Sequence, residues 1–314
     1  MPKRLVGVVC LLFILLIMAG CAKNNTQVSP QAARTLTDST GYAVKLPAKP
    51  QRIVSLSIGT DELLTGLVPL ERIAALTYLA DDSAISNIAD KARQVPRKIK
   101  ANAETIISLK PDLVLAPNWL PAELVQIIRE AGIAVYVYKS PDNVEAVKQT
   151  VAELAGVVGE EQAGSRIVEA MNTELSQVEA KLRQLPEEQK KVVIQFTVMG
   201  GSGGKGSTFD DLCRYAGVKN GAALAGLNAN EVLSKEQIVG VNPDILLLPA
   251  WDYGGKTDLQ KYRAEVQNDP ALQPIKAVKQ HQLIQVPDRY LFASSQYIVD
   301  GVRELAKAAY PDLF

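Results

Sequence analysis

The chain has 314 residues, and its 34 basic residues balance its 34 acidic residues. No basic stripe stands out along it, which argues against a nucleic-acid-binding protein. One histidine and three cysteines leave few donors for a bare zinc or manganese ion, because such sites draw on several imidazole, thiolate or carboxylate ligands. Composition therefore disfavours both a nucleic-acid binder and a protein with its own metal centre.

The first twenty residues have the pattern of a signal peptide. Two basic residues precede an apolar run over residues 5–18, which is shorter than the ~20 residues that a membrane-spanning helix needs. Small residues at positions 19 and 20 then precede Cys21. This arrangement resembles the lipobox of bacterial lipoproteins, with Met18 where that pattern usually has Leu. The resemblance implies acylation of Cys21; an ordinary secretory signal is the alternative.

The residues after the signal peptide suggest a tether and then two domains. Residues 22–39 are polar and predict a flexible tether, and about 270 residues remain, which suits two domains of ordinary size. Cys213, the one cysteine left besides Cys21 and Cys10 of the signal peptide, is expected to be buried. We expect a signal peptide (1–20), a lipidated cysteine with tether and lead-in (21–50), an N-terminal α/β lobe (51–158), a connecting helix (159–186) and a C-terminal α/β lobe (187–314).

From residue 52 onward, short aliphatic runs alternate with helical segments. Strands are predicted at 53–57, 73–78, 113–116 and 133–138, and helices at 61–67, 102–109 and 121–131. This βαβα order predicts a parallel sheet with helices on both faces. The aliphatic runs do not alternate with polar residues, as is typical of strands buried on both sides.

The middle of the chain is helical. One helix is predicted over 142–156, ended by Gly159, and a longer one over 160–185. At 1.5 Å per residue the longer helix would span about 37 Å, enough to join two lobes. A second run of strands begins at 192–198. The predicted fold class is α/β, with two Rossmann-like lobes containing parallel sheets and joined by a single long rigid helix.

An internal repeat supports two similar halves. Residues 104–119 align without gaps to residues 236–251, and seven of the sixteen positions are identical. Each copy reads as a short helix that begins with a Glu, a Pro-Asp turn, a buried strand and a loop that ends in a Trp. A long-period repeat is typical of repeated structural units, so each lobe is expected to present one copy.

Aromatic residues mark the expected ligand site. Trp119 and Trp251 are the only tryptophans, and ligands of open α/β sheets bind beyond the carboxyl ends of the strands. Tyr78 and Tyr253 extend the same aromatic rim. Local packing of loop aromatics is the alternative, but the matched positions of the two tryptophans favour a ligand held between the lobes.

Arg289 and Tyr290 follow the last predicted strand and add a cation and a ring near the same rim. Arg289 could pair with an acidic group of a ligand or with a neighbouring carboxylate such as Asp288.

Glu104 and Glu236 occupy the same repeat position in the first turn of a predicted helix. Asn102 and Ser234 are expected to cap these helices, and a carboxylate there offsets the helix dipole. Helix stability alone does not explain why both lobes carry it. Matched exposed carboxylates also suit a two-point docking surface for cationic side chains.

The Gly-rich segment 200–207 admits a catalytic alternative. It contains a Gly-x-Ser-x-Gly pattern around Ser202, as in hydrolase nucleophile elbows, and the outline of a dinucleotide fingerprint. The single histidine, His281, is expected in a polar turn before an edge strand. A ligand-facing loop at the end of a strand is the preferred interpretation, with no catalytic residue and no cofactor.

These motifs together resemble the substrate-binding lipoproteins of ABC importers for ferric siderophores, haem and cobalamin. The similarity covers the chain from about Arg52 and includes residues 50–56, 102–104, 110–114, 234–238 and 242–245. It implies two α/β lobes joined by one rigid helix, with the ligand between them. It also implies that Glu104 and Glu236 face arginines of a permease dimer. Where the cobalamin binder has a Trp before the first docking Glu, this chain has Arg97, Lys98 and Lys100, which favours an anionic chelate.

The sequence therefore predicts a monomeric, non-enzymatic receptor, lipid-anchored on the extracytoplasmic face of the membrane. It would capture an iron chelate or a related macrocycle and deliver it to an ABC permease. A cobalamin or haem binder of the same family is one alternative. An exported serine hydrolase that uses Ser202, and a surface interaction protein without a small-molecule ligand, are the others.

Overall fold

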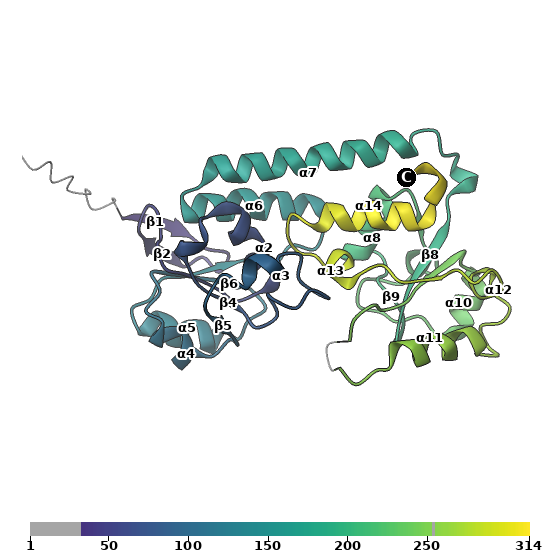
Figure 1. Ribbon diagram of the computed structural model, residues 1–314, viewed down its shortest axis with the longest axis horizontal. Coiled ribbons are helices and arrows are strands. Elements are labelled where there is room, and N and C mark those ends of the chain that lie inside the picture. The colour runs from purple at the N-terminus through teal and green to yellow at the C-terminus, as the bar shows by residue number, and fades with distance from the viewer. Residues whose placement is uncertain (1–32, 253–254) are drawn as a thin grey trace, which may run out of the picture. The chain divides into compact units, whose positions relative to one another are not determined.

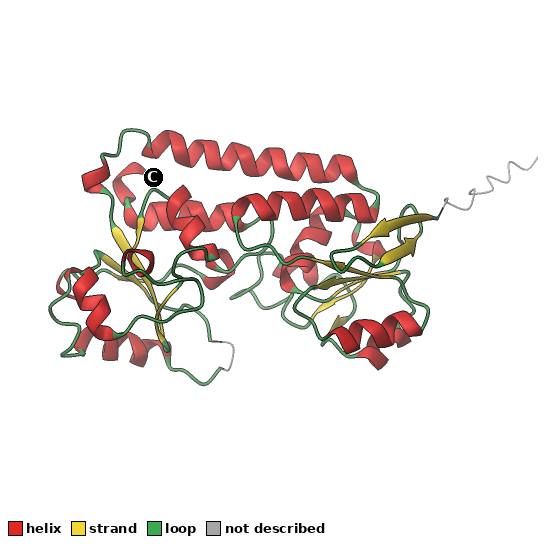
Figure 2. Ribbon diagram, turned by 180° about the vertical axis from the view of Figure 1, so that it is seen from behind, coloured by secondary structure: helices red, strands yellow, loops and turns green. Residues whose placement is uncertain are grey.

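Two mainly parallel β-sheets, each covered by helices, and a two-stranded antiparallel hairpin are found in the described part of the chain (Figures 1 and 2). The computed structural model describes residues 33–252 and 255–314. Within this part of the chain the predicted fold class is confirmed: two α/β lobes, with a long helix between the strands of the first and those of the second. None of the described helices has the length and apolar character needed to cross a membrane. Cys21, the predicted lipid-anchor site, lies outside the described residues, as does Tyr253.

The first lobe (the N-lobe) contains a five-stranded sheet in the order β5-β4-β3-β6-β7, with every pair parallel. Its strands are β3 (Ile53–Ser55), β4 (Ile73–Thr77), β5 (Lys98–Ile99), β6 (Leu113–Pro117) and β7 (Val135–Tyr138). Its helices are α2 (Ile58–Leu67), η1 (Leu70–Arg72), α3 (Ala89–Ala92), α4 (Ala103–Ser108) and α5 (Ala122–Glu130).

The second lobe (the C-lobe) has the parallel order β10-β8-β11-β12, and β9 pairs antiparallel with β8. Its strands are β8 (Val192–Thr197), β9 (Gly200–Ser202), β10 (Lys219–Asn220), β11 (Ile245–Leu247) and β12 (Leu283–Ile284). Its helices are η2 (Glu187–Gln189), α8 (Thr208–Tyr215), α9 (Gly221–Leu224), α10 (Lys235–Val241), α11 (Leu259–Asn268), α12 (Lys276–Lys279), α13 (Asp288–Leu291), α14 (Ile298–Ala309) and η3 (Pro311–Leu313). Cys213 on α8 is buried, as predicted.

The two copies of the sequence repeat occupy equivalent places. The first copy forms α4, β6 and the loop to Trp119, and the second forms α10, β11 and the loop to Trp251. β6 pairs with β3, the first strand of its sheet, and β11 pairs with β8, the corresponding strand of the C-lobe. The repeat therefore places the same helix–strand–loop unit next to the first strand of each sheet.

Side chains from both faces of each sheet are buried. In β6, Leu113 and Leu115 belong to one hydrophobic cluster, and Val114 and Ala116 belong to another. This alternation follows the two-residue period of a strand. The prediction of strands buried on both sides is confirmed, because helices supply apolar side chains to each face.

Three helices connect the lobes through a common core. α6 (Val144–Val158) packs on α7 (Glu161–Leu182), and α14 packs on α7, α6 and α8 (Figure 1). A single hydrophobic cluster includes Ile53 of the N-lobe sheet, Met171 of α7 and Val193 of the C-lobe sheet. α7 has 22 residues and so spans about 33 Å. Gly159 ends α6, as the sequence predicts, and adopts a left-handed conformation.

The last part of the predicted flexible tether (22–39) is a β-strand in the structure. Arg34–Thr37 forms β1, which pairs antiparallel with β2 (Ala43–Leu46). The turn between them is fixed by Asp38, whose buried carboxylate accepts hydrogen bonds from the backbone N–H of Thr40 and from Arg129 of α5. Ordered structure therefore begins before residue 39, because a partner far along the chain stabilises this hairpin.

Candidate ligand-binding site

The N-lobe contains a cavity of about 330 Å³ at the carboxyl ends of its strands. Each of the five strands contributes to this cavity, which we call the N-lobe cavity. Ligands of open α/β sheets bind at this edge because the loops that follow the strands converge there. The lining residues at or after the strand ends are Leu56 and Ser57 (β3), Thr77 and Tyr78 (β4), Ile99 and Lys100 (β5), Trp119 (β6) and Ser140 (β7).

Trp119 and Tyr78 are open to solvent in this cavity. Their exposed fractions are 61% and 40%, so both side chains are accessible to a bound ligand. The Lys100 ammonium lies 5.1 Å from the centroid of the Tyr78 ring, within cation–π distance. The cavity therefore combines two aromatic surfaces, one cation and several hydroxyl groups.

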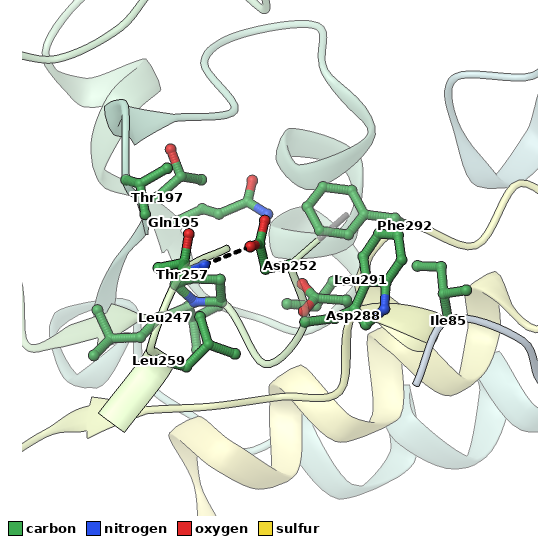
Figure 3. Close-up of a pocket in the computed structure, with 14 residues that line it drawn as sticks. Ile85, Gln195, Thr197, Leu247, Asp252, Thr257, Leu259, Asp288, Leu291 and Phe292 are labelled. Carbon is green, nitrogen blue, oxygen red and sulfur yellow. Dashed lines mark hydrogen bonds between the residues drawn. The ribbon is translucent and has the colours of Figure 1, made fainter. Parts of the chain in front are cut away.

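A second cavity of about 390 Å³, the C-lobe cavity, lies at the carboxyl ends of the C-lobe strands (Figure 3). Thr197 and Val198 line it at the end of β8, and Trp251 lines it after β11. Most of its other lining residues are apolar. These are Ile85, Leu247, Leu248, Pro249, Leu259, Leu291 and Phe292.

Two short segments connect the cavities. Phe292 lines the C-lobe cavity and Ser294 lines the N-lobe cavity. Because two residues of extended chain span at most ~7 Å, the two cavities are close neighbours. The second segment leaves the N-lobe cavity at Leu79 and reaches the C-lobe cavity at Ile85. Within it, Asp82 accepts a hydrogen bond of 3.3 Å from the indole N–H of Trp251.

Asp288 fixes the loop that carries Trp251. Its carboxylate accepts hydrogen bonds from the backbone N–H groups of Ala250, at 2.8 Å, and of Trp251. Only 4% of Asp288 is exposed, and this burial raises the pKa of its carboxyl group. Asp288 therefore fixes the loop that carries Trp251, which lines the C-lobe cavity and donates to Asp82.

Arg289 and Tyr290 lie in a neighbouring recess rather than among the residues that line either cavity. The recess also includes Asn87 and Asp300. The Arg289 guanidinium lies 4.8 Å from the centroid of the Tyr290 ring and donates a 2.8 Å hydrogen bond to the Ser83 carbonyl. In this geometry Arg289 joins the C-lobe to the segment that carries Asp82. Its predicted role towards a ligand stays a prediction.

Glu104 and Glu236 are both exposed, each in the first turn of its helix. Asn102 caps α4 through its side chain, and Ser234 forms a capping box with Gln237 on α10. Both predicted caps are confirmed. Neither carboxylate lines one of the two cavities, so both remain available on the surface of their lobes.

Ser202 and His281 do not come together. Ser202 lies in β9 opposite Gln195 of β8, not on a turn between a strand and a helix. His281 precedes the amino end of β12, and β11 and β8 separate it from β9. Three strand spacings correspond to about 14 Å. This exceeds hydrogen-bond distance several times over, so the pair cannot form the Ser–His arrangement of a hydrolase.

Several lining residues could not be found from sequence patterns. The resemblance singled out Lys100 with Arg97 and Lys98, but did not show which of these cations lines the cavity. Ser57 and Ser140 are isolated polar residues in loops. Ile85 and Phe292 come from loops that carry no motif. The signal available was positional: Lys100 and Ser140 follow strands of the same parallel sheet as Tyr78 and Trp119.

A family model described as periplasmic binding protein matches residues 53–290, which include the strands of both sheets. The chain belongs to this family. The match includes both copies of the repeat and most of the residues that line the two cavities.

Two similar proteins have names that refer to transport or uptake. The chain is 26% identical to YvrC of Bacillus subtilis, named as an uncharacterized ABC transporter substrate-binding lipoprotein, over 100% of this chain and 99% of that one. It is 24% identical to the iron-uptake system-binding protein of the same organism, over 88% and 89%. The periplasmic heme-binding protein RhuT of Roseiflexus sp. RS-1 has a similar structure, with a TM-score of 0.71, 23% identity and coverage of 84% and 99%.

Proposed function

We propose that this protein is a lipid-anchored extracytoplasmic receptor that binds an iron chelate or a related macrocycle between its lobes and delivers it to an ABC permease. The observation that carries the proposal is the pair of neighbouring cavities, one at the carboxyl ends of each sheet and each with a Trp from the same repeat position. Family membership and the names of the relatives support the transport role.

The donor groups of the described residues favour a metal that arrives inside a chelate. No group of three or more His, Cys, Asp or Glu side chains in that part of the chain is close enough to hold a metal ion. Iron would then keep the ligands of its chelator, and the protein would contact the organic surface of the complex. Trp119, Trp251 and Tyr78 would stack on that surface, and Tyr253 would extend it.

Binding is tested by tryptophan fluorescence. We expect one class among ferric hydroxamates, ferric catecholates, haemin and cobalamins to quench the emission saturably. Removal of both indoles (W119A/W251A) should weaken binding at least tenfold, as measured by calorimetry, because each stacked aromatic contributes about 0.5–1.5 kcal/mol beyond the area it buries. If none of these ligands binds, the chelate assignment is wrong and a surface interaction protein becomes the better interpretation.

Delivery is tested on the two exposed carboxylates. We propose that Glu104 and Glu236 dock on cationic side chains of the permease, so E104K/E236K should abolish ligand uptake by cells. Ligand affinity of the purified variant should not change, because neither residue lines a cavity. Reversal of the exposed Glu123 on α5 (E123K) is the matched control. Uptake by E104K/E236K at the wild-type rate would refute this docking role.

The remaining parts of the proposal are an acylated Cys21, a monomeric state and the absence of catalysis. C21S should remove incorporation of radiolabelled palmitate and release the protein from the membrane fraction. S202A should bind the ligand like the wild type, since Ser202 is not among the residues that line either cavity.

A further inference from the structure

The two cavities differ in charge as well as in lining. Among the residues that line the N-lobe cavity there is one cation, Lys100, and no carboxylate. Among those that line the C-lobe cavity there are two carboxylates, Asp252 and Asp288, and no cation. A ligand that occupies both cavities therefore meets surfaces of opposite polarity at its two ends.

Lys100 is positioned to meet an anion. Its neighbour Lys98 forms an ion pair with Asp81 at 3.3 Å. Lys100 takes part in none of the ion pairs among the described residues and lies over the Tyr78 ring instead. Ser140 lines the same cavity and its hydroxyl adds a hydrogen-bond donor suited to carboxylate or phenolate oxygens, whereas the Ser57 hydroxyl already contacts Thr60 and Tyr138. The Lys100 charge is thus directed to the site rather than to a partner in the fold.

The C-lobe cavity is unsuited to an anion. The Asp252 carboxylate accepts hydrogen bonds from the backbone N–H groups of Lys256 and Thr257, at 2.6 and 2.7 Å, and Asp288 accepts one from Ala250. An ionised carboxylate accepts hydrogen bonds but cannot donate them, and none of the described residues that line this cavity is a cation that could offset a second negative charge. The surrounding leucines, Ile85 and Phe292 instead favour the burial of hydrocarbon.

We infer that the ligand is amphiphilic: an anionic, metal-chelating head lies in the N-lobe cavity beside Lys100, and an uncharged apolar arm lies in the C-lobe cavity. This inference rests on the proposed function and gives it a ligand class and an orientation. Lys100 selects for the anionic head, and the leucine-lined C-lobe cavity selects for the arm.

Four synthetic ferric trihydroxamates test both ends independently. Each carries either a free carboxylate or its methyl ester, and either an eight-carbon acyl arm or none. For the wild type we expect the carboxylate to bind about fivefold more tightly than the ester, since one partly exposed ion pair has a modest effect. The acyl arm should strengthen binding at least tenfold, because several methylene groups would leave water.

Two variants separate the contributions. K100Q should abolish the preference for the carboxylate over the ester and keep the effect of the acyl arm. L259Q is a polar substitution at the half-buried start of α11. It should abolish the effect of the acyl arm and keep the preference for the carboxylate over the ester. K45Q is the control for net charge, because Lys45 is exposed on β2 and lines neither cavity. K100R should retain the carboxylate preference.

The outcomes distinguish a failure of the amphiphile assignment from a failure of the proposed function on which it rests. If the four chelates bind with equal affinity, or if K45Q acts like K100Q, the amphiphile assignment is overturned while chelate binding stands. If neither these chelates nor the wider panel of chelates and macrocycles binds, the proposed function itself fails. Selective loss of one preference in each variant, with both proteins folded by circular dichroism, would establish the orientation.

Discussion

At the scale of single residues, the same sequence position acquires different surroundings in the two lobes. Trp119 is mostly exposed, whereas Trp251 is half-buried and donates to Asp82. Both positions were predicted from the repeat, because an indole after a strand of a parallel sheet must emerge at the carboxyl edge. The partner Asp82 was not predictable, because it comes from an unpatterned loop 169 residues earlier.

Glu62 of α2 is a second residue whose importance depends on distant partners. Its buried carboxylate accepts hydrogen bonds from the backbone N–H and side-chain amide of Asn87 and from the Ser295 hydroxyl. Asn87 also donates to the Arg289 carbonyl. Glu62 therefore joins the N-lobe to the segments on both sides of the recess around Arg289.

The protonation of Glu62 should make stability depend on pH. Burial raises its pKa to about 7, whereas a Glu in an unfolded chain titrates near ~4.3. Between these values the folded state binds the proton more tightly, so stability is highest at the acidic end and falls as pH rises towards 7. In E62Q the loss of unfolding free energy between pH 5 and 8, measured by urea denaturation, should be smaller by about 1–3 kcal/mol.

Glutamine is a suitable replacement because its amide oxygen can accept from Asn87 while its amide nitrogen donates to Ser295. An E62Q protein whose stability falls between pH 5 and 8 as steeply as that of the wild type would show that Glu62 is already ionised at pH 5. Asp61, whose pKa burial also raises to about 7, remains in both proteins. Because the Glu62 charge adds to this increase, its removal in E62Q should lower the pKa of Asp61 and reduce the pH dependence further in the same direction.

At the scale of elements, the pairing of α6 with α7 depends on small residues at the contact. A Cβ atom at Gly164 would overlap the Cβ of Ala155 and meet the Val151 carbonyl at 3.5 Å. The helix backbones therefore approach closely at this point. Gly156, in the last turns of α6, has open space where its Cβ would lie.

Two Gly→Ala substitutions should change the unfolding free energy differently. G164A should reduce the unfolding free energy by about 1–3 kcal/mol, because the added methyl group overpacks the helix contact. G156A should leave it unchanged or raise it by up to ~1 kcal/mol, because alanine is the better helix former. Chemical denaturation of both variants measures the difference, and equal effects would mean that α6 and α7 are not closely packed at Gly164.

Elements within aliphatic or periodic runs were predictable from sequence, and short strands outside such runs were not. The strands β3, β4, β6, β7 and β8 and the helices α6 and α7 follow from aliphatic runs and helical periodicity, with boundaries within a few residues. β5, β9 and β10 have two or three residues each and no aliphatic run around them, so they give no periodic signal. Their hydrogen bonds depend on neighbouring strands, and the β1–β2 hairpin depends on Arg129.

At the scale of the whole molecule, the described residues form two lobes with one hydrophobic core that both lobes share. Each lobe also has a second hydrophobic core of its own. The shared core contains side chains of both sheets together with α6, α7 and α14. The outer face of each sheet has its own cluster, such as that of Ile106 and Ile128 in the N-lobe and that of Ile238 and Leu272 in the C-lobe. Neither lobe can lose its structure without exposing apolar surface of the other.

This arrangement predicts a single unfolding transition. Calorimetry should show one peak, with a calorimetric enthalpy equal to the van't Hoff enthalpy, although proteins with two domains often depart from two-state behaviour. A bound chelate should shift the whole peak to higher temperature. Two resolved peaks, of which the ligand moves only one, would contradict a shared core.

The position of α14 in the chain has a consequence for the order of events during folding. This helix supplies Ile298, Val302 and Leu305 to the shared core and packs on α7 and α6, more than 110 residues earlier in the chain. Contacts of such high contact order form slowly, since a long loop must close first. If the chain is exported amino end first, as the proposed function implies, α6 and α7 emerge before α14 and expose an apolar face until α14 packs on them. We expect variants that weaken α14 to be degraded by proteases more readily than the wild type, because this face stays exposed for longer.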